Sequence, residues 1–154
     1  TWNTIIGSIP GALPPVGGWT AATGSLDAPA WILFGILFCW QMPHFLAIAI
    51  IYATDYERGG FKMLPTIYPE SRRTSYVILF FTIALFITSL GLYMLKVVGI
   101  IYAIGVAIIG TIFFIIALQV IINSTKQNAR RLMLASIIYL PVLLMLILIE
   151  RMLF

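Results

Sequence analysis

Two polar side chains stand inside an otherwise apolar run of the sequence. Gln41 and His44 lie within residues 29–52, a stretch made largely of Ile, Leu, Ala, Phe and Trp. Polar groups are costly inside a membrane and usually face the interior of a helix bundle. His44 and Asp55 are eleven residues apart, which on one helix places them about 20° apart in rotation and about 16 Å apart in height. Tyr52 lies near the same line, so the spacing predicts a polar stripe that leads from a charged end to a histidine at depth.

Charged residues gather directly after this apolar run. Asp55, Arg58 and Lys62 follow one another within a short segment. Mg²⁺ in proteins is typically held by one or two carboxylates together with substrate phosphates. Arg and Lys bind phosphate oxygens, and Arg can do so with two hydrogen bonds at once. The cluster therefore predicts half of a metal–diphosphate site, with Asp55 as the Mg²⁺ ligand.

Simpler interpretations exist for each of these residues. His44 could simply donate a hydrogen bond to a neighbouring helix and have no role in binding or catalysis. Asp55 and Arg58 could form a solvated helix end, since exposed charges contribute little by themselves. Basic residues elsewhere are more typical of orientation signals than of substrate ligands; these are Arg72, Arg73, Arg130 and Arg131.

The elements that must position these residues are membrane helices. The chain is 62% hydrophobic and 9% charged, whereas a soluble domain is roughly 25% charged, so a soluble fold is excluded. Long apolar segments predict an all-α, polytopic transmembrane bundle with five helices. Their ranges are 3–23, 29–52, 76–95, 98–122 and 132–149. The first is rich in Gly and Pro and predicts a kinked helix packed inside a bundle.

The basic residues are distributed unequally between the two sides of the membrane. Five crossings place the loops 53–75 and 123–131 on one face. That face carries seven basic residues and the opposite face two; the seven are Arg58, Lys62, Arg72, Arg73, Lys126, Arg130 and Arg131, and the two are Lys96 and Arg151. Because cytoplasmic loops are enriched in Lys and Arg, the loop 53–75 is predicted to be cytoplasmic.

Four stretches resemble one known family. Residues 3–15 read NTIIGSIPGALPP, residues 40–45 WQMPHF, residues 55–65 DYERGGFKMLP and residues 136–141 SIIYLP. In this order and spacing they resemble the protoheme IX farnesyltransferases, or heme O synthases, which are UbiA-type membrane prenyltransferases. The resemblance covers essentially the whole chain. It implies a nine-helix bundle of which residues 1–154 form the C-terminal half, with the last five helices.

The resemblance also implies a reaction and its participants. The family transfers the farnesyl group of farnesyl diphosphate to a vinyl group of heme B, with Mg²⁺ assistance, and forms heme O. Heme B is then a substrate and not a prosthetic group. The implied setting is the bilayer of a bacterial inner membrane. The implied partners are the missing N-terminal half and, as candidates, heme–copper oxidase assembly factors; nucleic acid is not among them.

Residue roles follow by position from the same resemblance. Asp55 belongs to the second aspartate motif, beside the diphosphate and its metal, and Arg58 and Lys62 neighbour that diphosphate. His44 lies deeper, toward the heme. Further candidates for lining the substrate cavity are Asn3, Gln41 and Tyr52. The family's first aspartate-rich motif is absent from this sequence, so the chain alone is expected to be inactive.

Two rival interpretations remain at this point. A prenyltransferase of the same superfamily that acts on an aromatic quinone precursor would usually carry a second, spaced aspartate near Asp55, and the sequence has none there. A non-enzymatic transporter or assembly module would be indifferent to the change Asp55→Asn.

Overall fold

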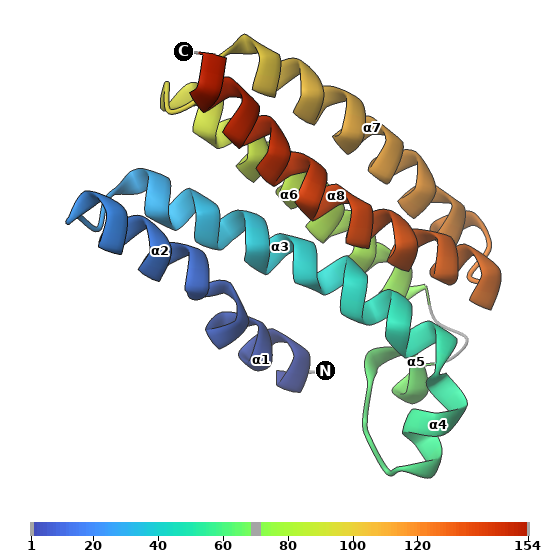
Figure 1. The fold of residues 1–154 in the computed structure, drawn as a ribbon. Helices are drawn as coiled ribbons and strands as arrows, with labels where there is room; N and C mark the ends of the chain where they lie inside the picture. Colours follow the sequence, from blue (N-terminus) through green and yellow to red (C-terminus); the bar gives the residue numbers. More distant parts are fainter. Residues whose placement is uncertain (1, 69–71, 154) are drawn as a thin grey trace.

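The computed structural model describes residues 2–68 and 72–153, with the side chains of residues 2 and 3 left out. All regular elements in these ranges are helices (Figure 1), which confirms the all-α class. Their bounds are α1 Trp2–Ala12, α2 Pro14–Thr23, α3 Ala28–Ile51, α4 Ala53–Arg58, α5 Leu64–Ile67, α6 Arg73–Met94, α7 Ile100–Ile122 and α8 Lys126–Leu153.

Four of these helices are long and apolar enough to cross a membrane, namely α3, α6, α7 and α8. The shortest, α6, has 22 residues, which at about 1.5 Å per residue exceeds the roughly 30 Å of a bilayer's hydrocarbon core. Together they form a four-helix bundle in which each helix packs against two others, in the order α3, α6, α7, α8 and back to α3. The chain is an integral membrane protein.

The predicted first helix is broken into two. Helix α1 ends at Ala12 and α2 begins at Pro14. Pro14 and Pro15 have no backbone N–H, so neither can donate the hydrogen bond that would continue α1, and the break follows from this. Neither piece alone is long enough to span a bilayer. Both lie against α3 on one side of the bundle (Figure 1).

The helix predicted over residues 29–52 ends too early to carry the predicted polar stripe as far as Asp55. Helix α3 ends at Ile51, and Tyr52 has φ −106° and ψ 26°, outside the helical range. The chain then enters α4, which turns away from the axis of α3 (Figure 1). Helical spacing therefore does not fix where Asp55 lies relative to His44, and the predicted continuous stripe is wrong beyond Ile51.

The loop predicted only as a polar connection contains its own compact structure. After α4, Gly60 adopts φ 72°, a left-handed conformation that favours glycine. The N–H of Phe61 donates to the carbonyl of Tyr56 and that of Gly60 to Glu57, and the rings of Tyr56 and Phe61 meet edge to face. This is a Schellman motif with its usual hydrophobic contact. It ends α4 and leads the chain back to α5.

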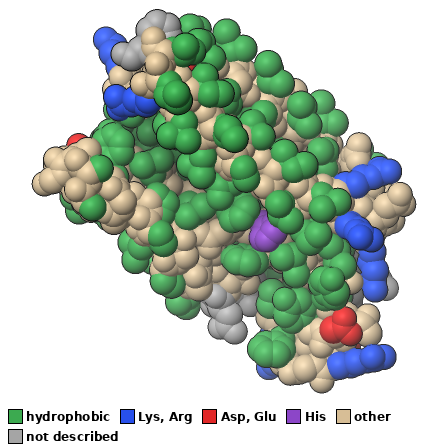
Figure 2. Space-filling view, in the orientation of Figure 1, with side chains coloured by type: hydrophobic (Ala, Val, Ile, Leu, Met, Phe, Trp, Pro, Cys, Tyr) green, Lys and Arg blue, Asp and Glu red, His purple; other side chains and the backbone are tan. Residues whose placement is uncertain are grey.

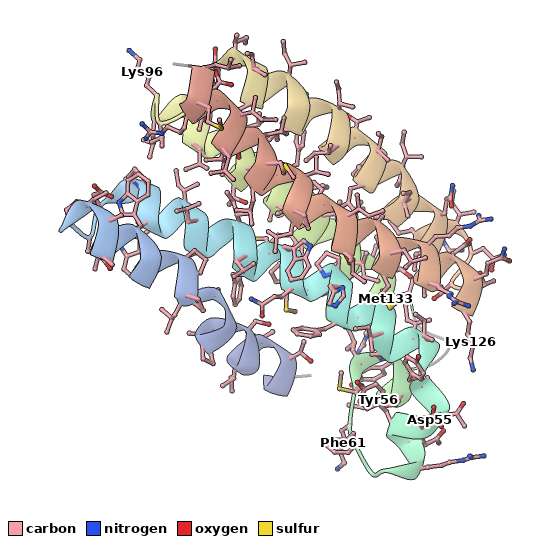
Figure 3. All side chains as sticks on the ribbon, in the orientation of Figure 1. Asp55, Tyr56, Phe61, Lys96, Lys126 and Met133 are labelled. Carbon is pink, nitrogen blue, oxygen red and sulfur yellow. The ribbon has the colours of Figure 1, made fainter. Side chains whose placement is uncertain are left out.

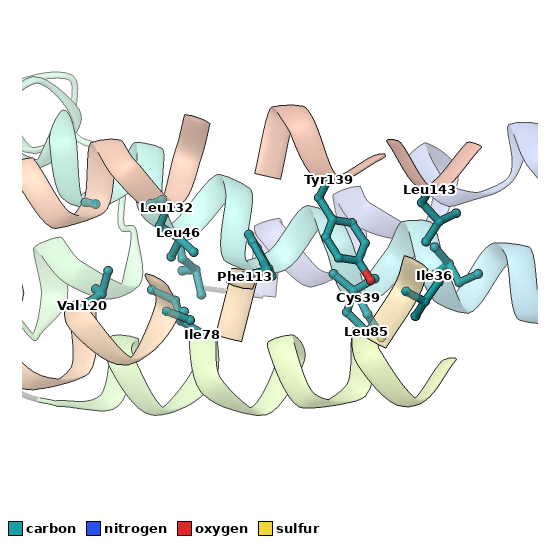
Figure 4. Close-up of a cluster of buried hydrophobic side chains, with 14 of the residues drawn as sticks. Ile36, Cys39, Leu46, Ile78, Leu85, Phe113, Val120, Leu132, Tyr139 and Leu143 are labelled. Atoms are coloured by element: carbon teal, nitrogen blue, oxygen red, sulfur yellow. The ribbon is translucent and has the colours of Figure 1, made fainter. Parts of the chain in front are cut away.

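The core fills the space between the four long helices. Apolar side chains from all of them meet there (Figure 4). Several polar groups inside the bundle pair with one another: the Tyr139 and Ser89 hydroxyls lie 3.1 Å apart, and the Tyr102 hydroxyl donates to the carbonyl of Ser89. Large apolar side chains on the outer faces, such as Phe80 and Ile108, are exposed. That arrangement suits a bundle whose surroundings are lipid.

The start of α7 is capped by a carboxylate from a different helix. Glu150 of α8 is only 5% exposed, and its Oε2 accepts a hydrogen bond of 2.8 Å from the N–H of Tyr102. The first N–H groups of a helix have no partner within the helix and carry partial positive charge. Glu150 therefore satisfies one of these groups and fastens α8 to α7.

Replacing this cap should destabilise the bundle. In Glu150→Ala the buried N–H of Tyr102 loses its acceptor, so the free energy of unfolding should fall by about 1–3 kcal/mol. Glu150→Gln keeps an acceptor oxygen and should lose less. Thermal unfolding in detergent, followed by far-UV circular dichroism, measures both. The exposed neighbour Arg151→Ala is the control, and equal unfolding temperatures for Glu150→Ala and wild type would contradict the capping role.

Candidate active site

The His44 side chain is held in place by two neighbours. Its Nδ1 lies 2.8 Å from the Ser136 hydroxyl of α8. On its other side the ring stacks on Trp40, one helical turn earlier, with centroids 5.0 Å apart and planes 12° apart. The Trp40 indole N–H donates to the backbone carbonyl of Ser136 at 2.7 Å. Both contacts of His44 thus converge on one residue of α8, which fixes the orientation of the imidazole.

The hydrogen-bond network assigns the tautomer of His44. The Ser136 hydroxyl donates its one proton to the carbonyl of Met133, at 2.6 Å. Its oxygen can then only accept from His44, so the imidazole carries its proton on Nδ1. This leaves the Nε2 lone pair available to a hydrogen-bond donor or a metal ion.

One edge of His44 remains accessible. The residue is only half-buried, and as the chain's single histidine it is seen in purple at the surface, surrounded by hydrophobic side chains (Figure 2). Next to it Phe45 is 40% exposed. His44 thus presents one oriented ring nitrogen at an apolar, partly aromatic surface.

Gln41 points to a different neighbour. It is 5% exposed, and its amide lies so close to the backbone of Gly11 that a Cβ at residue 11 would be 2.6 Å from Oε1. A few residues earlier in α1, the Ser8 hydroxyl lies 3.7 Å from the Met42 sulfur. The close approach of α1 to α3 thus depends on small residues in α1. Gln41 faces α1, while His44 faces α8.

The charged cluster lies at the end of the bundle, on α4 and the turn after it. Asp55, Arg58 and Lys62 are all exposed. Figure 3 shows Asp55 at the same end as Lys126 of α8 and far from Lys96. Tyr52, at the junction of α3 and α4, is 51% exposed. These side chains can therefore be reached from the aqueous side of the membrane.

A mostly apolar cavity lies between the interior of the bundle and this charged end. It has a volume of about 380 Å³ and is lined by parts of α1, α3, α5 and α6. Arg73 is the one charged residue among those that line it; the others are Thr4, Ile5, Met42, Leu46, Leu64, Tyr76 and Val77. A hydrocarbon chain with an anionic end is the kind of ligand that such a lining suits.

A complete metal site is not present in the part of the chain that the structure describes. No group of three or more His, Cys, Asp or Glu side chains comes together within residues 2–68 and 72–153. Asp55 could supply one exposed carboxylate, which fits an Mg²⁺ ion held mainly by phosphate oxygens and water. Asn3 lies in α1, but its side chain falls outside the described residues.

Comparison with known proteins identifies the family. A sequence profile described as the UbiA prenyltransferase family matches residues 1–144. The chain belongs to the UbiA prenyltransferase family. It is 41% identical to a protein named protoheme IX farnesyltransferase from Solibacter usitatus and 42% identical to one of the same name from Salinibacter ruber, in both cases over 97% of this chain.

These UbiA relatives are longer proteins. The aligned region covers 51% of the Solibacter protein and 53% of the Salinibacter protein, so the chain spans about half the length of the curated relatives it matches. No solved structure matches it. The resemblance read from the four sequence motifs is confirmed at the level of the family.

Sequence reasoning assigned no role to Ser136 or Trp40. Both belong to motifs that carried the family resemblance, yet Ser136 lies 92 positions from His44 and 96 positions from Trp40 in the chain. The only available signal was a serine inside an apolar run, which is a polar group expected to face the bundle. Its partner could not be read from periodicity.

The tautomer of His44 can be measured directly, because the chain has one histidine. In ¹⁵N-histidine-labelled protein in detergent, at a pH where the ring is neutral, two-bond ¹H–¹⁵N spectra should show the proton on Nδ1. In Ser136→Ala the acceptor is lost, and the proton should move to Nε2 in most molecules. A proton on Nε2 in the wild-type protein would contradict the arrangement. Ser89→Ala, a buried serine away from His44, is the control.

Proposed function

We propose that this chain is part of an enzyme that transfers the farnesyl group of farnesyl diphosphate to a vinyl group of heme B, giving heme O. The observation that carries the proposal is the identity of about 40% with proteins named protoheme IX farnesyltransferase, over nearly all of this chain. The oriented His44, the apolar cavity and the charged end provide places for the three parts of such a reaction.

The charged end would handle the leaving group. When the allylic C–O bond breaks, its electron pair leaves with the diphosphate, and the vinyl group supplies the pair for the new C–C bond. This leaves a cation on the vinyl carbon next to the porphyrin ring; water adds to it as a hydroxyl group and gives up a proton. Arg58 and Lys62 would bind diphosphate oxygens and stabilise the departing anion. Asp55 would hold Mg²⁺, which neutralises charge on the diphosphate. All three side chains are exposed on one short segment, so all three can contact a diphosphate group that arrives from water.

His44 would orient the heme. Its Nε2 lone pair is directed away from the Ser136 contact, and imidazole nitrogen is a common ligand of heme iron. Binding through this nitrogen would place the porphyrin against the apolar surface around Phe45. Gln41 would act indirectly, by holding α1 against α3 beside the cavity, whereas Tyr52 is not among the residues that line it.

A single exposed carboxylate does not make a metal–diphosphate site, and the relatives are about twice as long as this chain. We therefore propose that the active enzyme includes a further length of protein that supplies the remaining carboxylates and covers the face carrying His44. The isolated chain would be inactive. Its membrane would be the bacterial inner membrane.

The proposed orientation can be tested with reporters. The seven basic residues of the loop-bearing end should lie in the cytoplasm, because positive charge is retained there. An alkaline phosphatase fusion after Arg58 should be inactive, and a fusion after Lys96 active, since only the second would be exported. Active phosphatase after Arg58 would reverse the orientation.

Loss of the imidazole should weaken heme binding selectively. In His44→Ala, titration of the detergent-solubilised chain with heme B, followed by its absorbance, should give an affinity about tenfold or more below wild type, equivalent to about 1.4 kcal/mol. The affinity for farnesyl diphosphate should change less than twofold. Unchanged heme affinity would rule out a contact between His44 and heme.

Loss of the aspartate charge should stop turnover. Introduced at the corresponding position of a complete relative, Asp55→Asn should reduce heme O formation by about 10²-fold or more, as expected when a group that stabilises charge in the transition state is removed. The protein should remain folded in the membrane. Glu57→Gln removes another exposed carboxylate from α4 and should be nearly neutral. Product formation by Asp55→Asn at the wild-type rate would rule out the metal role.

A further inference from the structure

A second cavity opens at the loop-bearing end of the bundle, separate from the apolar one. Its volume is about 370 Å³, within the usual size of small-ligand sites. It lies where the end of α3, the start of α6 and the connection from α7 to α8 come together. Arg72 and Lys126 are among its lining residues, and no described acidic residue is. The described lining of the cavity is therefore positive.

Thr74 gives this cavity an unsatisfied hydrogen-bonding group. The residue lines the cavity and is only 4% exposed. Its hydroxyl has no hydrogen-bond partner among the described residues. A buried polar group without a partner is unfavourable and rare in native proteins. A ligand that accepts a hydrogen bond at this position would remove that penalty.

The backbone at the same place also favours an anion. Helix α6 begins at Arg73, with Arg72 as its N-cap residue and no described side chain capping it. The first N–H groups of a helix point outward with partial positive charge, which makes an uncapped start of a long helix a place for anions. The neighbouring start of α8 differs, because the hydroxyl of Thr125 accepts from the N–H of Asn128.

We infer that this cavity binds a phosphate group, supplied either by the headgroup of an anionic phospholipid or by free phosphate. Arg72 and Lys126 pair with the phosphate charge from the two sides of the cavity, and the Thr74 hydroxyl donates to a phosphate oxygen. Ile50 and Ile121 lie beside these polar groups, so the glycerol and first methylenes of a lipid also find apolar contact. Basic pockets between membrane helices are typical binding places for anionic headgroups.

The opposite end of the bundle offers a matched comparison. The cavity there has a volume of about 690 Å³ and is also lined by two basic residues, Lys96 and Arg151. Glu150 lines it as well and already occupies the start of α7. Among the described residues, the two ends present the same number of basic lining residues, but only the loop-bearing end combines them with a helix start that no described side chain caps and with an unpartnered hydroxyl.

The test uses the whole 154-residue chain, delipidated in a neutral detergent and titrated with short-chain phosphatidylglycerol or phosphatidylcholine. Native mass spectrometry counts the bound lipids. Wild type should hold one phosphatidylglycerol preferentially. The double variant Arg72→Gln/Lys126→Gln should bind it about tenfold or more weakly, and the control Lys96→Gln/Arg151→Gln should stay within twofold of wild type. Equal affinity in wild type and the first variant, or equal losses in both variants, would overturn the site.

A second variant separates binding from folding. In Thr74→Val an unpaired buried hydroxyl is replaced by a methyl group, so the ligand-free protein should unfold at the same or a higher temperature. Its affinity for phosphatidylglycerol should nevertheless fall by about threefold or more. Wild-type affinity in Thr74→Val would also overturn the proposal.

Competition distinguishes the two sources of the phosphate. If millimolar inorganic phosphate displaces the bound phosphatidylglycerol, the site recognises the free anion. If the lipid stays bound, and phosphatidylcholine does not replace it, the site is one for anionic lipid. The inference stands apart from the proposed heme chemistry, because none of Arg72, Thr74 and Lys126 belongs to the proposed heme and farnesyl diphosphate site.

Discussion

Inside a bilayer there is no water to satisfy a polar group, so a polar group that enters is costly unless it finds a partner in the protein. This constraint accounts for the contacts that hold the bundle together. Ser136 joins the Trp40 indole and the His44 ring of α3 to α8. Glu150 joins α8 to the start of α7. The apolar side chains keep the helices in the membrane, and these polar contacts fix how α3, α7 and α8 pack against one another.

Helix α3 is the element on which the proposed site depends. It contacts α1 and α2 on one side, α6 and α8 in the bundle, and α4 and α5 at its end. Residues separated by only a few positions on it therefore reach different neighbours. Gln41 meets α1, His44 meets α8, and beyond Ile51 the chain enters the charged loop. No single element therefore supplies all the parts of the proposed site.

Hydropathy and composition were enough to predict the all-α class and the approximate locations of α3, α6, α7 and α8, because apolar runs of that length have few alternatives. The start of α8 was predicted too late: residues 126–131, expected in a loop, are helical. The run of residues with Pro14 and Pro15 indicated a kink, but not that the helix would break into α1 and α2. The predicted stripe from His44 to Asp55 was wrong because helical periodicity applies only while the helix continues, and α3 ends just before Tyr52. The hydrogen-bond partner of His44 could not be predicted either, because Ser136 lies on α8, 92 positions away. Motif strings identified the family, but they assigned no function to Ser136 or to the cavity near Thr74.

The most direct test of the central claim is mass spectrometry of heme extracted from cells that lack their own heme O synthase. The cells would express this chain alone, or together with the half of the Solibacter relative that it does not match. The two halves of that relative, expressed as separate pieces, serve as the positive control. Farnesylated heme should appear only when both pieces are present. If the control gives product while this chain with its complement, both shown to be in the membrane, gives none, the proposed activity is wrong.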